Sequence, residues 1–198
     1  RQHGLNLTVV DCGVNHDFLT GLPAGIERPG LLVRKVEGGE KGTADSSVQA
    51  AMTMAQCQQA LHNGQDIVKA LPGNALLLGE MGIGNTSAAS LLLARLSGLD
   101  IEVCTGAGTG LDAPAVQRKT AVLRGVLARH ADAKEPLAAL AAFGGFEIAT
   151  LVGAILQAAQ ERRVIVVDGF IATSAVLVGH GLEALVLQRC VFSHRPGE

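Results

Sequence analysis

Short apolar runs that end in glycine or an acidic residue recur along the chain. They are rich in aliphatic and β-branched residues and roughly four to eight residues long, a pattern typical of strands buried in a parallel sheet. We predict strands at Leu5–Val10, Ala75–Leu78, Ile101–Cys104, Val164–Val167 and Glu183–Phe192.

Longer stretches rich in Ala, Leu and Gln separate these runs, and their apolar residues recur at helical spacing. Asn85 and Asp112 stand where N-cap residues would begin two helices, and Pro114 suits a first helical turn. The segment from 21 to 45 is rich in Gly, Pro and charged residues, which predicts an exposed loop. The pattern predicts helices over Ser46–Leu61, Thr86–Leu96, Ala113–His130, Phe146–Arg163 and Ile171–Gly179.

Strands that alternate with helices through short connections favour right-handed βαβ units. The predicted fold is therefore α/β: a doubly wound, mostly parallel sheet with helices on both faces, in a Rossmann-like three-layer arrangement. No internal repeat or clear boundary divides the sequence, so residues 1–198 are predicted to form a single α/β nucleotide-binding core. In such folds ligands bind at the carboxyl ends of the strands.

The composition supports a packed domain and excludes several classes of protein. The 198 residues include 16 Lys and Arg against 18 Asp and Glu, a net charge of −2, and 48% of them are hydrophobic. These values exclude an intrinsically disordered chain and argue against a basic nucleic-acid-binding protein. Trp and Tyr are both absent, so the protein does not hold its ligand by stacking on these side chains.

The cysteines and histidines show no spacing typical of a metal site, so no metal ligand is predicted. The widely separated Cys12, Cys57, Cys104 and Cys190 are expected to be free thiols. The first residues lack the pattern of a signal peptide, and no uninterrupted apolar run reaches about 18 residues. We expect a cytoplasmic protein without a membrane-spanning segment.

The segment Gly79–Ser87 follows a predicted strand and leads into a predicted helix. Its glycines leave backbone N–H groups free at the helix start, which favours binding of an anion. The spacing is close to that of a P-loop, but Asn85 stands in place of the lysine that such a loop needs, and Glu80 adds a negative charge. A single phosphate beside a ribose therefore fits better than a triphosphate. Tight packing of helix against strand is the alternative reason for these glycines.

A second glycine-rich loop, Thr105–Asp112, is also predicted to join a strand to a helix. Its glycine spacing misses the dinucleotide fingerprint, which weakens the case for NAD. Lys119 lies about two turns into the following helix, and because helical side chains lean toward the N-terminus, its ammonium could reach the phosphate site. Alternatively, Lys119 and its neighbour Arg118 are solvated surface cations.

Three acidic residues, Asp11, Glu80 and Asp168, each follow a predicted strand. At one edge of a sheet they could bind a metal, hold ribose hydroxyls or stabilise a positive centre. Each alone could instead cap a helix or close a turn. The glycine turn at Phe143–Glu147 is either a helix-helix elbow or a ligand contact. The spacing alone does not decide between these interpretations.

Several segments of the chain belong together as one set of motifs: Gly42–Asp45, Ala51–Thr53, Gly79–Ser87, Thr105–Asp112 with Arg118 and Lys119, Phe143–Ala149 and Val166–Ser174. They span nearly the whole chain and follow one another in a fixed order. The set resembles that of the nicotinate-nucleotide–dimethylbenzimidazole phosphoribosyltransferase family, which acts in assembly of the cobalamin nucleotide loop.

The resemblance implies transfer of the 5-phosphoribosyl group from nicotinate mononucleotide to 5,6-dimethylbenzimidazole, which gives α-ribazole 5′-phosphate and nicotinate. It implies these two small molecules as partners, a homodimer, and no metal or organic cofactor. Gly82, Gly108 and Lys119 would meet the phosphate, while Glu80 would stabilise positive charge on the reacting sugar. The substrate-binding residues expected in all are Glu80, Met81, Gly82, Gly108, Thr109, Lys119, Gly144, Gly145, Asp168 and Gly169.

The sequence also departs from the family's pattern. The family's general base is a Glu in a Leu-Gly-Glu-Gly segment that would lie beyond Glu198, so no catalytic base is assigned. The family's small-domain segments, with an Asp-His-Gly motif and part of the benzimidazole pocket, are expected to be absent. His194-Arg195-Pro196 places Pro where a family Ser would approach the phosphate. The alternatives are a nucleotide-binding core without catalytic activity, or another nucleotide-dependent transferase or hydrolase.

Overall fold

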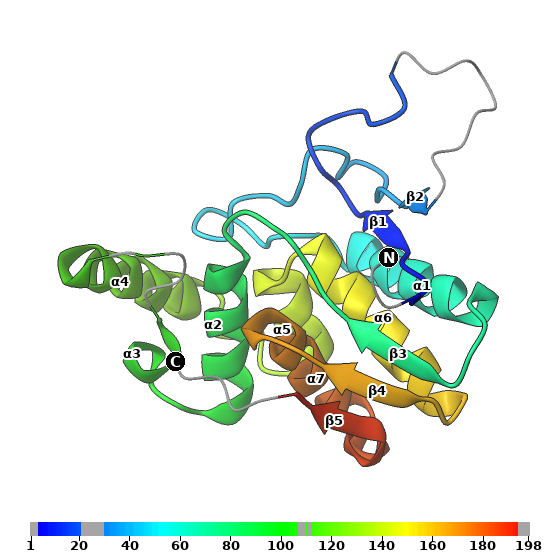
Figure 1. Cartoon of the computed structure of the whole chain (residues 1–198). Helices are drawn as coiled ribbons and strands as arrows, with labels where there is room; N and C mark the ends of the chain where they lie inside the picture. The colour runs from blue at the N-terminus through cyan, green and yellow to red at the C-terminus, as the bar shows by residue number, and fades with distance from the viewer. Residues whose placement is uncertain (1–3, 21–29, 107–109, 111, 194–198) are drawn as a thin grey trace.

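The computed structural model describes residues 4–20, 30–106, 110 and 112–193 and shows an α/β fold (Figure 1). One parallel sheet joins β1 (Val9–Asp11) to β2 (Leu31–Val33). A second parallel sheet has the order β3 (Ala75–Leu78), β4 (Val164–Val167) and β5 (Cys190–Phe192). The predicted α/β class, the parallel pairing of the strands and the flanking helices are confirmed, and the described strands form two sheets where one was expected.

Helices connect and flank these strands (Figure 1). Two of the predicted strands, at β3 and β4, have the bounds expected from the sequence, and the helices that follow them differ from the prediction by only a few residues at each end. The helices are α1 (Met54–Ala70), α2 (Asn85–Ser97), α3 (Ile101–Cys104), α4 (Ala113–Arg129), α5 (Pro136–Phe143), α6 (Phe146–Gln160), α7 (Phe170–Leu182) and the 3₁₀ helix η1 (Ala184–Arg189).

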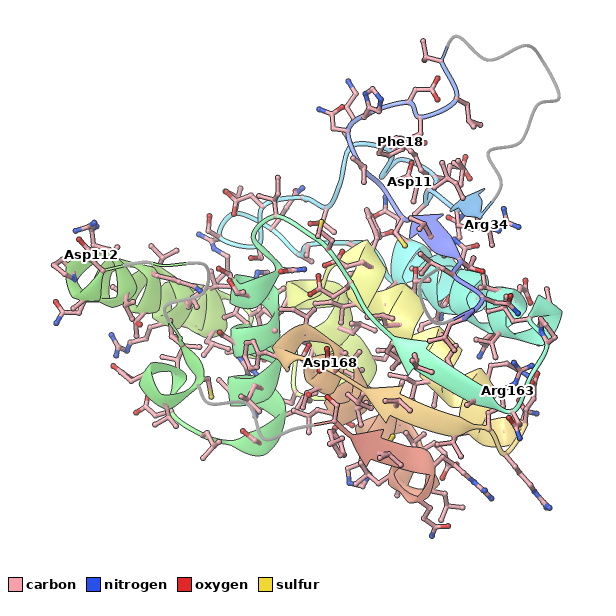
Figure 2. The ribbon with its side chains drawn as sticks, viewed as in Figure 1. Asp11, Phe18, Arg34, Asp112, Arg163 and Asp168 are labelled. Atoms are coloured by element: carbon pink, nitrogen blue, oxygen red, sulfur yellow. The ribbon has the colours of Figure 1, made fainter. Side chains whose placement is uncertain are left out.

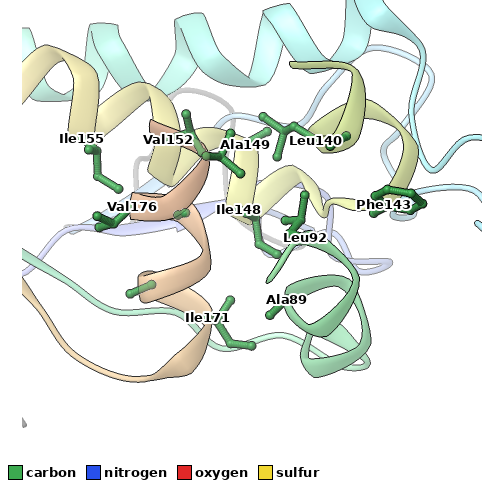
Figure 3. Packing of buried hydrophobic residues seen from close by; sticks show 14 of the residues in the cluster. Ala89, Leu92, Leu140, Phe143, Ile148, Ala149, Val152, Ile155, Ile171 and Val176 are labelled. Carbon is green, nitrogen blue, oxygen red and sulfur yellow. The ribbon is translucent and has the colours of Figure 1, made fainter. Parts of the chain in front are cut away.

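Helix α6 forms the centre of the hydrophobic core. It packs against α1 on one side and α7 on another, and its residues Ile148, Val152 and Ile155 are fully buried. Figure 3 shows side chains of α2, α5, α6 and α7 meeting in this cluster. Because α6 begins in the buried turn after α5, the core also fixes the position of its first residues.

Two glycines allow α1 and α6 to approach closely. A Cβ atom added to Gly153 would lie 2.7 Å from the carbonyl carbon of Leu61 and would overlap its carbonyl oxygen. A Cβ atom added to Gly64 would lie 2.7 Å from the backbone nitrogen of Ala154. Ordinary contacts of a Cβ atom begin near 3.4 Å, so only glycine fits at these two positions.

The strand predicted at Ile101–Cys104 is wrong, because this segment forms helix α3. Asp100 caps the helix by accepting a hydrogen bond from the backbone N–H of Glu102. Ile101 and Cys104 are buried while Val103 is exposed, a spacing of three rather than two. A four-residue apolar run is short enough to suit either element, so periodicity could not distinguish them.

The helix predicted at Ser46–Leu61 begins later, at Met54. Thr53 and Gln56 form a capping box that starts α1 there. Before that point, the backbone N–H groups of Ala51 and Met52 donate to carbonyl groups of α5 instead of continuing a helix. This Thr-x-x-Gln pair is the sequence signal that places the start of the helix at Met54.

Other elements also differ from the prediction. Helix α5 was not predicted, and β2 lies within the segment expected to be a loop. The strand predicted at Glu183–Phe192 is reduced to β5, because η1 occupies most of that segment. Strand β1 is shorter than predicted and begins at Val9.

The register of the second sheet sets its carboxyl edge. Leu78 pairs with Val167, and Val167 pairs with Phe192, so the segments that follow β3, β4 and β5 leave the sheet at the same edge. Ile165 and Val167 are buried against the core, whereas Leu77 and Val191 are about half exposed. The carboxyl edge is the place where folds of this class bind ligands.

Candidate functional site

The loop after β3 and the turn after β4 lie at this carboxyl edge. Strand β3 runs into Gly79–Gly84, which leads directly into α2. Strand β4 runs into Asp168 and Gly169, which lead into α7. Figure 2 shows Asp168 and Arg163 at opposite ends of β4, with Asp168 at the carboxyl edge. The strand-to-helix junctions predicted after Leu78 and after Val167 are therefore present.

The start of α2 leaves its backbone donors available. Gly84 is the N-cap residue, with a positive φ of 81°, and no side chain caps the first N–H groups. Free N–H groups at a helix start, together with the helix dipole, favour an anion. In the preceding loop the side chains of Met81 and Ile83 are fully exposed. The loop can therefore present both backbone donors and apolar side chains to a ligand.

Asn85 binds Glu80 rather than capping α2 as predicted. Its amide nitrogen Nδ2 donates a hydrogen bond to Oε2 of Glu80, across the glycine loop. Asn85 is buried, so this bond fixes the carboxylate of Glu80 against the first residue of α2. The asparagine that replaces a P-loop lysine thus holds the acidic residue of the loop.

Lys119 reaches the first turn of α2 from the neighbouring helix α4. Its ammonium nitrogen Nζ donates a hydrogen bond of 3.2 Å to Oγ1 of Thr86. Thr86 follows Asn85, so the Lys119 ammonium and the Glu80 carboxylate are joined to adjacent residues at one helix start. The structure brings together these two residues, which are 39 positions apart in the sequence. Lys119 is not the solvated surface cation of the alternative interpretation.

Glu147 also lies against this loop and was not included among the predicted site residues. It occupies the first turn of α6, and its Oε1 atom would be 3.6 Å from a Cβ atom added to Gly82. Such a Cβ atom would also lie 2.7 Å from Nδ2 of Asn85. Gly82 therefore lies close to both the Asn85 amide and the Glu147 carboxyl group. The acidic residue that ends the Phe143–Glu147 turn was the available signal.

Burial raises the pKa of Glu147 above its ordinary value, and the nearby charge of Glu80 raises it further. A hydrogen bond from the backbone N–H of Glu147 itself acts in the opposite direction and offsets part of the increase. Among the described residues, no Lys or Arg forms an ion pair with either carboxyl group. Glu147 therefore binds its proton more tightly than an exposed glutamate does.

Gly144 and Gly145 form the elbow between α5 and α6. A Cβ atom added to Gly144 would lie 2.6 Å from the carbonyl oxygen of Leu140, and one added to Gly145 would meet the Glu147 carboxyl group. These contacts account for both glycines by close packing, which supports the elbow interpretation. A role in substrate binding stays a prediction.

Asp168 at the end of β4 accepts a hydrogen bond of 2.6 Å from the hydroxyl group of Ser193, which follows β5. Gly169 has a φ of 84° and forms the N-cap of α7. Ser193 was not predicted, because nothing in the sequence indicates that β5 pairs next to β4. The pair places a carboxylate and a hydroxyl group together at the carboxyl edge.

The third acidic residue, Asp11, has a structural role. Its Oδ1 atom accepts hydrogen bonds from the backbone N–H groups of Gly13 and Val14, and Lys35 forms an ion pair with Oδ2 at 3.4 Å. Asp11 thus closes a turn, as its alternative interpretation states.

Cys12, the residue after Asp11, is held in a similar way: its thiol donates to the hydroxyl of Thr150 at 3.6 Å. Burial raises the pKa of Cys12 to about 11.

The second glycine loop differs from the prediction because it follows a helix. It joins α3 to α4, and Asp112 caps α4 by accepting a hydrogen bond of 2.8 Å from the N–H of Ala115. The predicted binding residues Gly108 and Thr109 lie outside the described residues.

Within the described ranges, no group of three or more His, Cys, Asp or Glu side chains is arranged to hold a metal ion. The three strand-end acids therefore give no support to a metal site. In the same ranges, no helix has the length and apolar character needed to cross a membrane.

Comparison with known proteins connects this site to a family. A profile described as "Phosphoribosyltransferase" matches residues 1–198. The nicotinate-nucleotide–dimethylbenzimidazole phosphoribosyltransferase of Variovorax paradoxus (strain S110) is 66% identical over 197 residues, which cover 100% of this chain and 54% of that protein. The protein of the same name from Dechloromonas aromatica (strain RCB) is 48% identical and is covered over 56% of its length.

Solved structures give the same relationship. The crystal structure of CobT from Thermus thermophilus has a TM-score of 0.82 and 31% identity to this chain, covering 94% of this chain and 54% of the other. The chain thus spans about half the length of the curated relatives it matches. Because the family profile matches the whole chain, the chain belongs to the phosphoribosyltransferase family.

Proposed function

We propose that this chain provides the nucleotide-binding part of an enzyme that transfers the 5-phosphoribosyl group from nicotinate mononucleotide to 5,6-dimethylbenzimidazole. The names of the relatives support this reaction. The observation that carries the proposal is that a cation and a carboxylate lie at the start of the same helix. Lys119 is hydrogen-bonded to Thr86, and Glu80 is hydrogen-bonded to the adjacent Asn85. A nucleoside monophosphate needs both: a cation for its phosphate and a carboxylate near its sugar.

In this proposal the phosphate binds the free N–H groups at the start of α2 and the ammonium of Lys119. Gly82 and Gly84 allow the backbone to approach the phosphate because they lack side chains. Lys119 then releases or shares its hydrogen bond to Thr86. The phosphate does not react, so these contacts serve to hold the sugar in place.

Transfer breaks the bond between C1′ and the pyridine nitrogen of nicotinate and forms a bond from C1′ to a benzimidazole nitrogen. As nicotinate leaves with the bonding electron pair, positive charge develops on the sugar, and the Glu80 carboxylate would stabilise it. The benzimidazole N–H loses its proton in the same reaction. None of the described residues is assigned as the base that accepts this proton.

The remaining expected contacts belong to the same proposal. Asp168 and Gly169 lie at the carboxyl edge, where they would meet the ribose, and Met81 would contact an apolar part of the substrates. Gly108, Thr109, Gly144 and Gly145 complete the predicted set, and a homodimer in the cytoplasm is the expected form.

The direct test incubates the purified chain with nicotinate mononucleotide and dimethylbenzimidazole and separates the products by chromatography. The proposal expects nucleotide-dependent formation of α-ribazole 5′-phosphate and an equal amount of nicotinate. Release of nicotinate without dimethylbenzimidazole would favour a hydrolase. Binding of the mononucleotide without product would favour a nucleotide-binding core without activity, and absence of binding would refute the proposed function.

A further inference from the structure

One face of the sheet formed by β3, β4 and β5 is apolar and open to solvent. The register pairs Leu77 with Val166 and Val166 with Val191, so these three side chains form one row across the sheet. Ala75 and Val164 form the neighbouring row. Leu77 is 58% exposed, Val164 46% and Val191 53%. All five side chains are apolar, and we call the surface that they form the open face.

The three strands have the composition of strands that are covered on both sides. Strand β3 reads Ala-Leu-Leu-Leu, β4 reads Val-Ile-Val-Val and β5 reads Cys-Val-Phe. Strands with one solvated face alternate apolar with polar residues, whereas these strands are apolar throughout. Parallel sheets occur almost only with helices over both faces, and exposed apolar area of this kind costs hydrophobic free energy. The open face is therefore suited to burial.

The connections between these strands run on the other side of the sheet. The chain passes from β3 to β4 through α2 to α6, and from β4 to β5 through α7 and η1. In Figure 1, α6 and α7 lie behind the sheet, and the core on that side buries Ile165 and Val167. Right-handed crossovers that continue in one direction across a sheet keep their helices on one face. The described helices therefore leave the open face without a covering layer.

The lengths of the relatives indicate what covers the open face. The chain spans 54% of the Variovorax paradoxus relative and 54% of the CobT chain from Thermus thermophilus. A second copy of this chain fits less well, because each partner in a standard interface contributes roughly 20–30 residues, far more than the side chains of the open face. Helices of the same polypeptide need less area. A linked segment does not lose the translational and rotational freedom that separate partners lose on docking.

We propose that the open face is an intramolecular interface, covered by amphipathic helices from the part of the family's length that this chain does not span. Leu77, Val166 and Val191 each stand one residue before the last residue of their strand. Helices packed on this row therefore reach the carboxyl edge, where Glu80 and Asp168 follow β3 and β4. The same helices would close the candidate site on that side. The interface itself does not depend on the proposed reaction.

The test compares the purified chain with a chimera in which this chain replaces the 197 matched residues of the Variovorax paradoxus relative. Leu77→Cys introduces a thiol on the open face of both proteins, and its rate of reaction with N-ethylmaleimide is followed. Peptide mass spectrometry separates this thiol from the native cysteines. Val122→Cys on α4 is the matched control, because Leu77 and Val122 have the same exposed fraction of 58%.

In the chain alone the two thiols should react at similar rates. In the chimera the Leu77→Cys thiol should react at least about 10-fold more slowly than the Val122→Cys thiol, because a covered thiol reacts only after local opening. Equal rates in the chimera would overturn the proposal. A Leu77→Cys rate that falls with rising concentration of the chain alone would also overturn it, since a second copy then covers the face.

A second protein keeps the test decisive if the chimera does not fold, as judged by circular dichroism. The same cysteine is then placed in the whole Variovorax paradoxus relative, at the residue aligned with Leu77, and the same protection is expected there. Fast labelling at that residue would refute the interface. None of these measurements uses a nucleotide, so failure of the proposed reaction leaves this test unaffected.

Discussion

The close approach of α1 and α6 makes a sharp prediction for Gly153→Ala. The new Cβ atom would lie 2.7 Å from the carbonyl carbon and 2.9 Å from the Cα atom of Leu61, where ordinary contacts begin near 3.4 Å. Both partners are backbone atoms, so no side chain can rotate away. Restoring the contact with the carbonyl carbon from 2.7 to 3.4 Å requires a shift of 0.7 Å, and the overlap with the carbonyl oxygen of Leu61 requires a larger one. A gap of about 0.5–1 Å already sacrifices about a quarter to a half of the dispersion energy of each contact across the interface.

The magnitude follows from two opposing effects. Alanine gains about 1 kcal/mol over glycine within a helix. Overpacking of a core costs typically about 1–3 kcal/mol, and the overlap with a backbone carbonyl group puts this site at the upper end. We expect Gly153→Ala to lower the free energy of unfolding by about 1–2 kcal/mol after the helical gain is subtracted.

Urea denaturation followed by circular dichroism measures this change. Gly125→Ala is the matched control, because Gly125 is exposed within α4 and a Cβ atom there meets nothing within 4 Å. The control should raise the free energy of unfolding by up to about 1 kcal/mol. If Gly153→Ala were as stable as Gly125→Ala, the reasoning on the α1–α6 interface would be refuted.

Two further predictions concern stability. Arg163→Met should lower the free energy of unfolding by roughly 2–4 kcal/mol. The reason is that the buried guanidinium donates hydrogen bonds to the carbonyl groups of Val68 and Leu71 at the end of α1. A loss below about 1 kcal/mol in urea denaturation would contradict the importance of these two hydrogen bonds. Burial raises the pKa of Cys57 from 9.0 to about 11, so the folded state holds the thiol proton more tightly than the unfolded state does. The resulting contribution of Cys57 to the free energy of unfolding is complete below pH 9 and is lost as the pH rises through 11. The free energy of unfolding should therefore fall less steeply across this range in Cys57→Ala than in the unchanged chain, and identical slopes would contradict the burial argument.

The sequence was most informative where a single segment contains the whole signal. The runs Ala75–Leu78 and Val164–Val167 are aliphatic or β-branched, end at glycine or an acid, and precede Ala-rich stretches, so strand, turn and helix could each be predicted. The run Ile101–Cys104 is similar in composition, but Asp100 caps it as a helix. Composition alone could not separate these cases, because four apolar residues suit a strand and one helical turn equally well.

The candidate site was predictable only in part, for a related reason. Glu80 and Lys119 could be proposed because each lies on or after a glycine-rich motif. Glu147 and Ser193 join the site through the packing of α6 and the pairing of β5 with β4, which no local pattern records. Long-range packing also decided the role of Asn85, whose local context indicates a cap but whose amide binds Glu80.

The central claim is that Lys119 and Glu80 serve one nucleotide site, and binding of nicotinate mononucleotide to Lys119→Ala tests it most directly. Arg118→Ala is the control, because it removes the same charge from the neighbouring, exposed position on α4. By calorimetry at low salt, Lys119→Ala should bind about 10-fold to 100-fold more weakly than the unchanged chain, as expected for the loss of a charge-assisted contact, whereas Arg118→Ala should bind nearly as the unchanged chain does. Equal affinities for the Lys119→Ala and Arg118→Ala variants would contradict the account.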